Sequence, residues 1–337
     1  MTPIRRVVAS APSRIDLAGG TLDIWPLSVL VPGASTVNLA IELRARVVIE
    51  PGSRAAVRVI SRDRRRRVTR RLPITPPARD SPLSMLLRLV SEFDPASGMT
   101  LVTEATAPAG AGLGGSSTLG IAAAAALDRF CGTALGRAAL LQRVMNLETR
   151  ELGVPTGNQD YLAALHGGLA IHHHESDGTR REKLVLPEEL ASRLVLAYTG
   201  QPRHSGYSNW DMFRRYIDGE ARTVRRMETI ARIAHELGDA LRAGALDTVG
   251  RLLGEEGRLR YTLAPTVGTD ALRRAGRVAL GAGALGVKVC GAGGGGCLVA
   301  FARAGRQEAV ARAIAATGAT LLPVRPARRG LLVDVLT

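Results

Sequence analysis

The sequence predicts an α+β fold divided into two domains. Segments with strand and helix patterns are mixed in both halves, without the regular βαβ repeat of a doubly wound sheet. At 337 residues the chain can bury the cores of two domains. The pattern changes near residues 180–185, so we expect an N-terminal domain at 1–183 and a C-terminal domain at 184–337.

In the first half, alternating apolar residues predict strands at 5–12, 34–43, 44–51 and 98–106. A helix is expected at 81–93. An alanine-rich segment to about Phe130 has high helix propensity and no interior proline. Further helices are expected at 137–151 and from Gln159, followed by a strand at 167–175. The arginine-rich stretch 62–71 is interpreted as the exposed tip and return strand of a hairpin.

In the second half, residues 183–190 and 193–200 resemble strands or strand edges. A long polar helical region is expected at about 205–240, with shorter helices reaching about 280. Residues 287–302 predict a strand, a glycine loop and a second strand. A helix at 305–316 and two short strands complete the expected fold.

The composition excludes several classes of protein. No apolar run is long enough for a membrane span, and the N-terminus has no signal-peptide pattern. Three cysteines are too few and too scattered for a disulfide framework, so we expect a cytoplasmic protein. The formal charge is +15, but nearly all the positive charge is arginine spread along the chain, and aromatics make up 3%. We therefore expect no nucleic-acid partner and no membrane partner, and a monomer or a homodimer.

The stretch "PAGAGLGGSST" at 108–118 matches G-x-G-x-x-G through Gly110, Gly112 and Gly115. A dinucleotide site also needs an acidic residue at the end of a following strand, and none is present. A Walker A loop needs a lysine that is absent here. A phosphate-binding loop at a helix N-terminus remains. Ser116 or Ser117 is expected to cap that helix, and either hydroxyl can bond a phosphate oxygen or Mg²⁺.

Three further segments support this interpretation. "APSRIDLAGGTLDIWP" at 11–26 contains Arg14, a glycine turn and Asp23. "NLETRELGVPTGNQDYLAALHGG" at 146–168 contains Glu148 and Asp160, and "KVCGAGGGGCLVAF" at 288–301 is a further glycine loop.

With these motifs in this order, the whole chain resembles the GHMP kinases, a family of small-molecule kinases. The resemblance is greatest to the branch of D-glycero-D-manno-heptose 7-phosphate kinases and bacterial fucose kinases. It implies an N-terminal domain similar to domain 2 of ribosomal protein S5 and a ferredoxin-like C-terminal domain. It also implies ATP and Mg²⁺ as cofactors.

The resemblance assigns roles to individual residues. Ser116 and Glu148 would bind Mg²⁺, with Glu151 as the alternative to Glu148. Asp160 would orient, and could deprotonate, the acceptor hydroxyl, with Arg14 beside it. ATP would be bound by Pro108, Gly110, Ala111, Gly112, Leu113, Gly114, Gly115, Ser116 and Ser117. Gly115 stands where many members carry a serine, and Ser117 is a candidate substitute.

The acceptor would be bound by Gly20, Thr21, Asp23, Arg203, Gly293 and Gly294. "GGTLD" differs from the "GGGTD" of related sequences, which leaves the partner of Asp23 open. Arg203 and His204 fit either a substrate contact or a surface turn. His172–His174 are not expected to bind a metal, because successive side chains of a strand lie on opposite faces.

The function expected is an ATP- and Mg²⁺-dependent kinase that phosphorylates a hydroxyl of a sugar or sugar phosphate. A heptose 7-phosphate or a hexose such as fucose fits best. Two alternatives remain. One is a kinase of the mevalonate or homoserine type, although mevalonate kinases resemble this motif with lysine at the position of Arg14. The other is a catalytically silent nucleotide-binding regulator, against which Glu148 and Asp160 argue.

Overall fold

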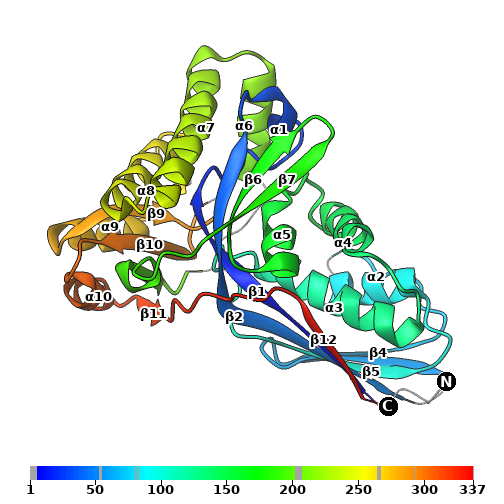
Figure 1. Cartoon of the computed structure of the whole chain (residues 1–337). Coiled ribbons are helices and arrows are strands. Elements are labelled where there is room, and N and C mark those ends of the chain that lie inside the picture. The colour runs from blue at the N-terminus through cyan, green and yellow to red at the C-terminus, as the bar shows by residue number, and fades with distance from the viewer. Residues whose placement is uncertain are drawn as a thin grey trace.

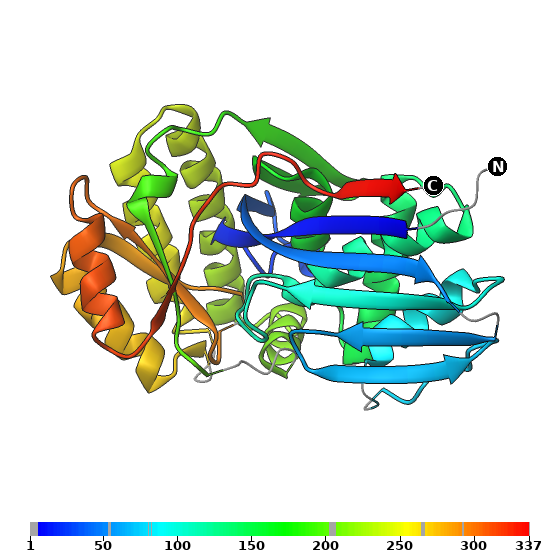
Figure 2. The same cartoon turned by 90° about the horizontal axis from the view of Figure 1, so that it is seen from below.

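The computed structural model describes residues 6–336 apart from 53–54, 80, 82, 202–206, 264–266 and 292. Strands and helices are mixed in both halves, which confirms the α+β class (Figure 1). In the part of the chain described, the strands form one sheet of eight strands and a second of four. Figure 2 shows the two sheets side by side.

The larger sheet has the order β12-β1-β2-β5-β3-β4, and β6 and β7 extend it from β2. All its pairs are antiparallel except β3 with β5. Its strands are β1 (Arg6–Ala18), β2 (Ser35–Pro51), β3 (Ala56–Ser61), β4 (Arg66–Arg71), β5 (Met99–Ala105), β6 (Leu169–Glu175), β7 (Gly178–Leu184) and β12 (Leu332–Leu336).

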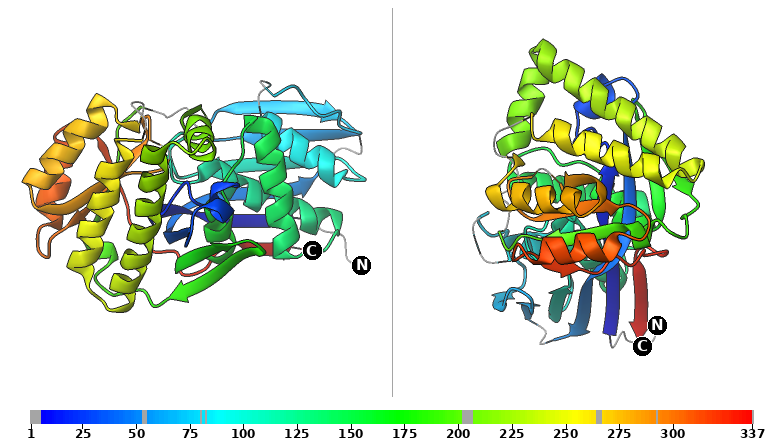
Figure 3. Two further views of the ribbon diagram at one scale, coloured as in Figure 1. Left: turned by 90° about the horizontal axis from the view of Figure 1, so that it is seen from above. Right: turned by 90° about the vertical axis from the view of Figure 1, so that its left-hand side faces the viewer.

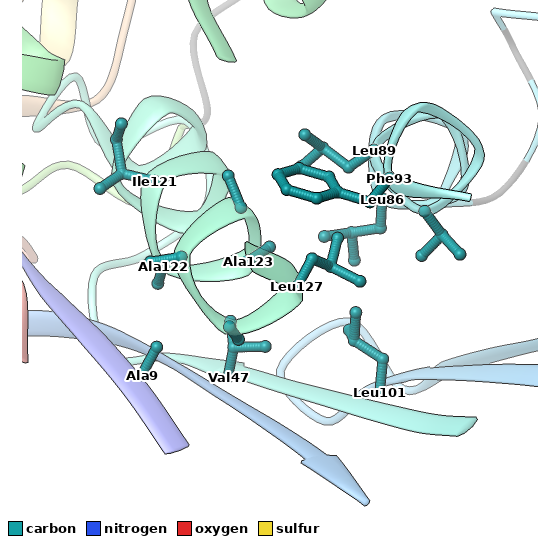
Figure 4. Packing of buried hydrophobic residues seen from close by; sticks show 14 of the residues in the cluster. Ala9, Val47, Leu86, Leu89, Phe93, Leu101, Ile121, Ala122, Ala123 and Leu127 are labelled. Atoms are coloured by element: carbon teal, nitrogen blue, oxygen red, sulfur yellow. The ribbon is translucent and has the colours of Figure 1, made fainter. Parts of the chain in front are cut away.

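Four helices cover one face of this sheet (Figure 1). They are α2 (Ser84–Phe93), α3 (Gly115–Cys131), α4 (Arg137–Leu152) and α5 (Gln159–His166). The alanines at 122–126 of α3 are all buried, and their small side chains let the helix lie close to the strands. In Figure 4, Ala9, Val47 and Leu101 of the sheet lie beneath α3, which carries Ala122 and Leu127. This core fixes the N-terminus of α3, where the glycine loop ends.

The smaller sheet has the order β11-β8-β10-β9, and all its pairs are antiparallel. Helices α8 and α9 gather at its end of the molecule (Figure 3). A core cluster that includes Leu39 of β2, Leu237 of α7 and Phe301 of β10 joins the two halves. The remaining elements are α1 (Leu27–Leu30), a 3₁₀ turn (Ala191–Arg193), β8 (Leu194–Tyr198), α6 (Tyr207–Ile217), α7 (Ala221–Arg242), α8 (Leu246–Arg260), α9 (Asp270–Gly281), β9 (Ala284–Val289), β10 (Cys297–Ala302), α10 (Gln307–Ala315) and β11 (Thr320–Leu322).

Several boundaries differ from those expected. The two strands expected at 34–51 are one strand, β2, with a register shift opposite Pro12. The helical region from 205 is divided into α6 and α7 at Gly219, whose φ of 72° ends the first helix. The strand expected at 183–190 is absent beyond β7, which ends at Leu184.

The arginine-rich stretch forms the hairpin predicted for it, with its turn at 62–65 between β3 and β4. β4 ends the strand order of the larger sheet, and exposed arginines on such an edge discourage pairing with another chain. The division of domains at 183/184 stays a prediction. The last strand, β12, pairs with β1 and so lies in the larger sheet. No helix in the described ranges has the length and apolarity needed to cross a membrane.

Candidate active site

A cavity of about 610 Å³ lies among the N-terminus of α3, the loop after β1, and the facing parts of α4 and α5. Fifteen of the residues predicted to form the site line it. These are Arg14, Gly20, Thr21, Asp23, Pro108, Gly110, Ala111, Gly112, Leu113, Gly114, Gly115, Ser116, Ser117, Glu148 and Asp160. Three of the four predicted segments supply these residues, and the fourth, 288–301, reaches the cavity wall through Gly291.

The glycine loop is left-handed at Gly110, Gly112 and Gly114, with φ of 70°, 80° and 75°. Gly114, rather than a serine, is the N-cap of α3, and no side chain caps the helix. The prediction that Ser116 or Ser117 caps it was wrong, because the left-handed Gly114 starts the helix one residue before them. Both serines therefore lie in the first turn, where helix N–H groups favour an anion.

The loop at 290–297 supports the glycine loop from behind. A Cβ on Gly112 would lie 2.3 Å from the Cys290 carbonyl oxygen. The Cys297 amide donates to the Ala111 carbonyl at 2.8 Å. Gly293 and Gly294, predicted to bind the acceptor, instead contact Val267, and Gly291 is the residue of this loop at the cavity wall. Those two assignments are not supported by the geometry.

Asp160 and Arg14 form an ion pair at the cavity wall. Arg14 Nη2 lies 2.5 Å from Asp160 Oδ1, and Nη1 donates to the Gly112 carbonyl at 2.9 Å. Arg14 is buried, whereas 20% of the Asp160 side chain is exposed. Asp160 lies in the first turn of α5, where the helix dipole favours its negative charge. A fixed carboxylate thus faces the cavity beside the glycine loop.

Glu148 of α4 is buried at the wall next to the serines. Its Oε2 accepts hydrogen bonds from Ser117 Oγ at 2.8 Å and from Tyr161 Oη at 2.5 Å. Burial raises the pKa of Glu148, and the hydrogen bonds from Tyr161, Ser116 and Ser117 oppose that rise. Ser116 is exposed. These oxygens converge on one region of the cavity and are of the type that Mg²⁺ prefers.

Glu151, the alternative to Glu148, is already paired. It accepts a hydrogen bond from Ser84 Oγ, and its Oε2 lies 3.1 Å from Arg88 Nε. The positive charge of Arg88 beside the Glu151 carboxylate opposes metal binding at Glu151, so the geometry favours Glu148 as the metal ligand.

Asp23 reaches the same wall from the loop after β1. Its carboxylate accepts hydrogen bonds from the backbone N and the side-chain Nε2 of Gln159, both at 3.1 Å. Burial, with the nearby Asp160 charge, raises the pKa of Asp23 to about 6. Asp23 therefore changes charge near pH 6, and it is held by Gln159, the residue that precedes Asp160.

The other predicted residues lie elsewhere. Arg203 and His204 fall outside the residues that the structure describes. The three histidines of β6 alternate as expected: His173 pairs with Glu182 at 2.9 Å, while His172 and His174 are buried on the other face. Burial lowers the pKa of His172 to about 3 and that of His174 to about 4, so both are neutral at pH 7. No group of residues suited to hold a metal by histidine, cysteine and carboxylate ligands occurs in the described ranges.

The sequence interpretation missed four buried charged residues beneath the loop at 19–23, namely Asp16, Glu256, Arg260 and Lys288. One signal was available. Lys288 is one of two lysines in a chain whose other basic residues are arginines, and it lies within an apolar strand. Glu256 and Arg260 lie in a polar helix and carry no such signal.

Comparison with known proteins agrees with this geometry. The model of the GHMP kinases N terminal domain matches residues 81–168, and that of the GHMP kinases C terminal domain matches residues 221–320. Together the two matches cover more than half of the chain.

The similar proteins include kinases of two acceptor classes. D-glycero-alpha-D-manno-heptose 7-phosphate kinase from Campylobacter jejuni is 28% identical over 225 residues, which is 65% of this chain and 66% of that protein, just under two thirds. Mevalonate kinase from Thermococcus onnurineus is 26% identical over 349 residues and 98% of each chain. The crystal structure of a D-glycero-D-manno-heptose 1-phosphate kinase from Bacteroides thetaiotaomicron has a TM-score of 0.77 at 24% identity, covering 98% of this chain and 99% of that one.

The two family models and the shared fold agree with the glycine loop, the Arg14–Asp160 pair and Glu148 in one cavity. The chain belongs to the GHMP kinase family, whose members use ATP.

Proposed function

We propose that this protein transfers the γ-phosphoryl group of ATP to a hydroxyl of a sugar or sugar phosphate. One observation carries the proposal: the carboxylate of Asp160, fixed by Arg14, faces a cavity bounded by the glycine loop and by the Asp23 loop. Phosphoryl transfer depends mainly on positioning and on neutralising charge. The groups that line the cavity can both position the reactants and neutralise charge.

The residues present fit ATP and Mg²⁺. The cavity is open at Gly115, where a Cβ would meet no atom within 4 Å, and Gly115 is the first residue of α3, whose N-terminus favours a phosphate. Ser116 and Glu148 are the ligands we propose for Mg²⁺, and Ser117 holds the Glu148 carboxylate. Bound Mg²⁺ would neutralise negative charge on the phosphates. The loop and α3 bind and orient the nucleotide.

Asp160 is the group we propose to act on the acceptor. Its exposed oxygen accepts a hydrogen bond from the acceptor hydroxyl, orients it, and can take its proton. Arg14 holds the carboxylate in place from the buried side, and its second contact, to the Gly112 carbonyl, fixes the glycine loop relative to Asp160. One arginine thus sets the position of both reacting partners.

The acceptor would bind between Asp160 and the loop of Gly20, Thr21 and Asp23. An ionised Asp23 accepts hydrogen bonds from hydroxyl groups, which suits a polyhydroxyl acceptor. The relatives named for heptose phosphates support a sugar phosphate, and the motif resemblance also favours a hexose such as fucose.

A panel of acceptors tests the proposal. Purified protein with Mg²⁺ and ATP is assayed for ADP release with fucose, galactose, heptose 7-phosphate and other sugar phosphates. We expect one acceptor to exceed all others, and Asp160→Asn to abolish its turnover. The absence of turnover on every sugar and sugar phosphate would contradict the proposal.

A mevalonate kinase is the second candidate, because relatives that align over nearly the whole chain carry that name. Mevalonate has one carboxylate and a primary hydroxyl rather than a ring of hydroxyls. Adding mevalonate to the panel distinguishes the two candidates in one experiment.

A further inference from the structure

Four buried charged side chains form a cluster beneath the acceptor loop, residues 19–23; we call them the charged quartet. They come from three elements: Asp16 from β1, Glu256 and Arg260 from α8, and Lys288 from β9. Lys288 Nζ lies 2.9 Å from Asp16 Oδ1 and 2.9 Å from Glu256 Oε1. Arg260 Nε lies 2.7 Å from Glu256 Oε1, and its Nη2 lies 3.8 Å from Asp16 Oδ2.

The quartet is electrically balanced, with two acids and two bases that are each at most 3% exposed. Burial alone would raise the pKa of Asp16, but the charges of Lys288 and Arg260 outweigh it, so the pKa of Asp16 is lowered. Buried ion pairs contribute little net stability, because each charge loses its hydration. Replacing one member leaves its partner charged and unpaired. A quartet of this kind is therefore poorly explained as a stabilising device.

The quartet makes direct contacts with the backbone of the acceptor loop. The Gly19 amide donates to Glu256 Oε2 at 2.8 Å, and Arg260 Nη2 donates to the Gly20 carbonyl at 2.5 Å. Arg260 Nη1 lies 3.5 Å from Thr21 Oγ1. A Cβ on Gly20 would lie 2.1 Å from Asp16 Oδ2, so the Asp16 carboxylate fills the space that a side chain there would take.

The loop needs such support because its conformation is unfavourable. Thr21 has φ of 82°, a left-handed conformation that costs a residue with a branched side chain about 1–3 kcal/mol. The far end of the loop is held by Gln159, which donates twice to Asp23. The near end is held by Arg260 and Glu256.

We propose that Arg260 is a positioning residue for the acceptor: its guanidinium, fixed by the quartet, holds the loop at 19–21 in the conformation that receives the acceptor. Through α8 the second half of the chain thus sets the geometry of acceptor binding, while ATP is bound by the glycine loop. The inference rests on the proposed function, because the loop receives an acceptor only if the protein is such a kinase.

Arg260→Lys tests the role of the guanidinium. Lysine keeps the positive charge beside Asp16 and Glu256, but one ammonium cannot reproduce the fork that reaches Glu256 and the Gly20 carbonyl together. We expect kcat/KM for the acceptor found in the panel to fall roughly ten- to hundredfold, because small displacements at a reacting centre are costly. The KM for ATP should stay within about twofold of wild type.

Arg232→Lys is the matched control. Arg232 also pairs with two glutamates, Glu236 and Glu255 at 2.7 Å each, but half of its side chain is exposed and it lies on α7. The control should keep wild-type acceptor kinetics. If Arg260→Lys also has wild-type acceptor kinetics, or raises the KM for ATP equally, the proposal is wrong.

A second measurement does not depend on any substrate. Amide hydrogen exchange of the peptide spanning 15–24 should accelerate by about tenfold or more in Arg260→Lys and stay unchanged in Arg232→Lys. Faster exchange with no turnover on any acceptor would contradict the proposed function while supporting the role of Arg260 in holding the loop. Unchanged exchange would overturn the inference whatever the acceptor.

Should Arg260→Lys fail to fold, the double variant Glu256→Met/Arg260→Met replaces it. This variant removes one acid and one base together, so Asp16 and Lys288 stay paired and the buried charge stays balanced. Apolar replacement of a buried ion pair is often tolerated. The double variant loses the contacts to Gly19 and Gly20, and we expect the same acceleration of exchange. A folded double variant with wild-type exchange at 15–24 would overturn the inference.

Discussion

The two ends of the cavity are formed by different kinds of chemical group: backbone atoms at one end and charged side chains at the other. The phosphate end is a glycine loop whose important groups are backbone atoms of consecutive residues, 108–117, at the start of α3. The acceptor end is made of charged side chains from β1, α5, α8 and β9, which are far apart in the sequence. The first end depends on the absence of side chains, and the second on the exact balance of charges. Mutations at the two ends should therefore have different effects on stability, on ATP binding and on acceptor kinetics.

The largest expected effect is that of Asp160→Asn, at the junction of the two ends. Asparagine keeps the shape but loses the charge that pairs with Arg14 and the ability to take a proton. We expect kcat to fall by about 10²–10⁴-fold, the range attributed to a general base. The affinity for ATP, measured by calorimetry, should change little because the glycine loop is intact.

Asp94→Asn is the control for that variant. Asp94 is an exposed carboxylate at the C-cap of α2, with a left-handed φ of 41° that asparagine also tolerates. It should leave kcat unchanged. A wild-type kcat for Asp160→Asn would remove Asp160 from the chemistry and leave it a structural partner of Arg14.

The second effect, Gly112→Ala, isolates the phosphate end. Alanine there meets two costs: the left-handed φ of 80° and a Cβ placed 2.3 Å from the Cys290 carbonyl oxygen. The carbonyl belongs to the backbone, so the loop itself must shift. We expect a loss of about 2–4 kcal/mol in the free energy of unfolding and weaker ATP binding, measured by urea denaturation and calorimetry.

Gly132→Ala separates these two costs. Gly132 ends the same helix with φ of 72°, and a Cβ there would meet no atom within 4 Å. It should lose about 1 kcal/mol through strain alone and bind ATP normally. Equal losses in the two variants would mean that the contact with the loop at 290–297 has no energetic role.

The difference between the two ends also explains what the sequence could predict. The glycine loop, Arg14, Glu148 and Asp160 lie in short motifs, because backbone conformation and helix starts leave local signatures such as glycine density. The quartet has no such signature. Glu256 and Arg260 sit four residues apart on a polar helix, a spacing that ordinarily indicates an exposed ion pair. Only the packing of α8 against β1 and β9 buries them.

Secondary structure shows the same limit. The helices and strands around the glycine loop appear close to their expected bounds, since their apolar periods are regular. The cap of α3, which differs from the prediction, and the contacts of Gly293 and Gly294 depend on the detailed backbone geometry. Val267 takes the contacts of those two glycines, and nothing in the sequence near 267 indicates that it would.

The third prediction concerns the pH dependence of the acceptor end. The pKa of Asp23 is about 6 in the folded protein, against an ordinary value of 3.8. The folded protein therefore binds this proton more tightly than the unfolded chain does. The contribution of Asp23 to stability is greatest below about pH 4 and declines as pH rises to about 6, above which it is constant.

Asp23→Asn removes that titration. Relative to wild type, the variant should gain stability between pH 4 and 7, by about 2–3 kcal/mol from the shift in pKa, in urea unfolding at a series of pH values. Its acceptor kcat/KM should also lose any rise through pH 6 that wild type has, because the ionised carboxylate is absent. A stability difference that is independent of pH would show that Asp23 keeps an ordinary pKa.

The smallest effect distinguishes the two serines of the phosphate end. Ser117 is buried and donates to Glu148, so Ser117→Ala should cost about 1–2 kcal/mol in the free energy of unfolding. Ser116 is exposed to the cavity, so Ser116→Ala should change stability by less than about 0.5 kcal/mol. If Ser116 binds Mg²⁺, Ser116→Ala should nevertheless raise the Mg²⁺ concentration for half-maximal activity several-fold. A variant with normal stability and a normal Mg²⁺ requirement would transfer the proposed role to Ser117, whose hydroxyl already contacts the Glu148 carboxylate.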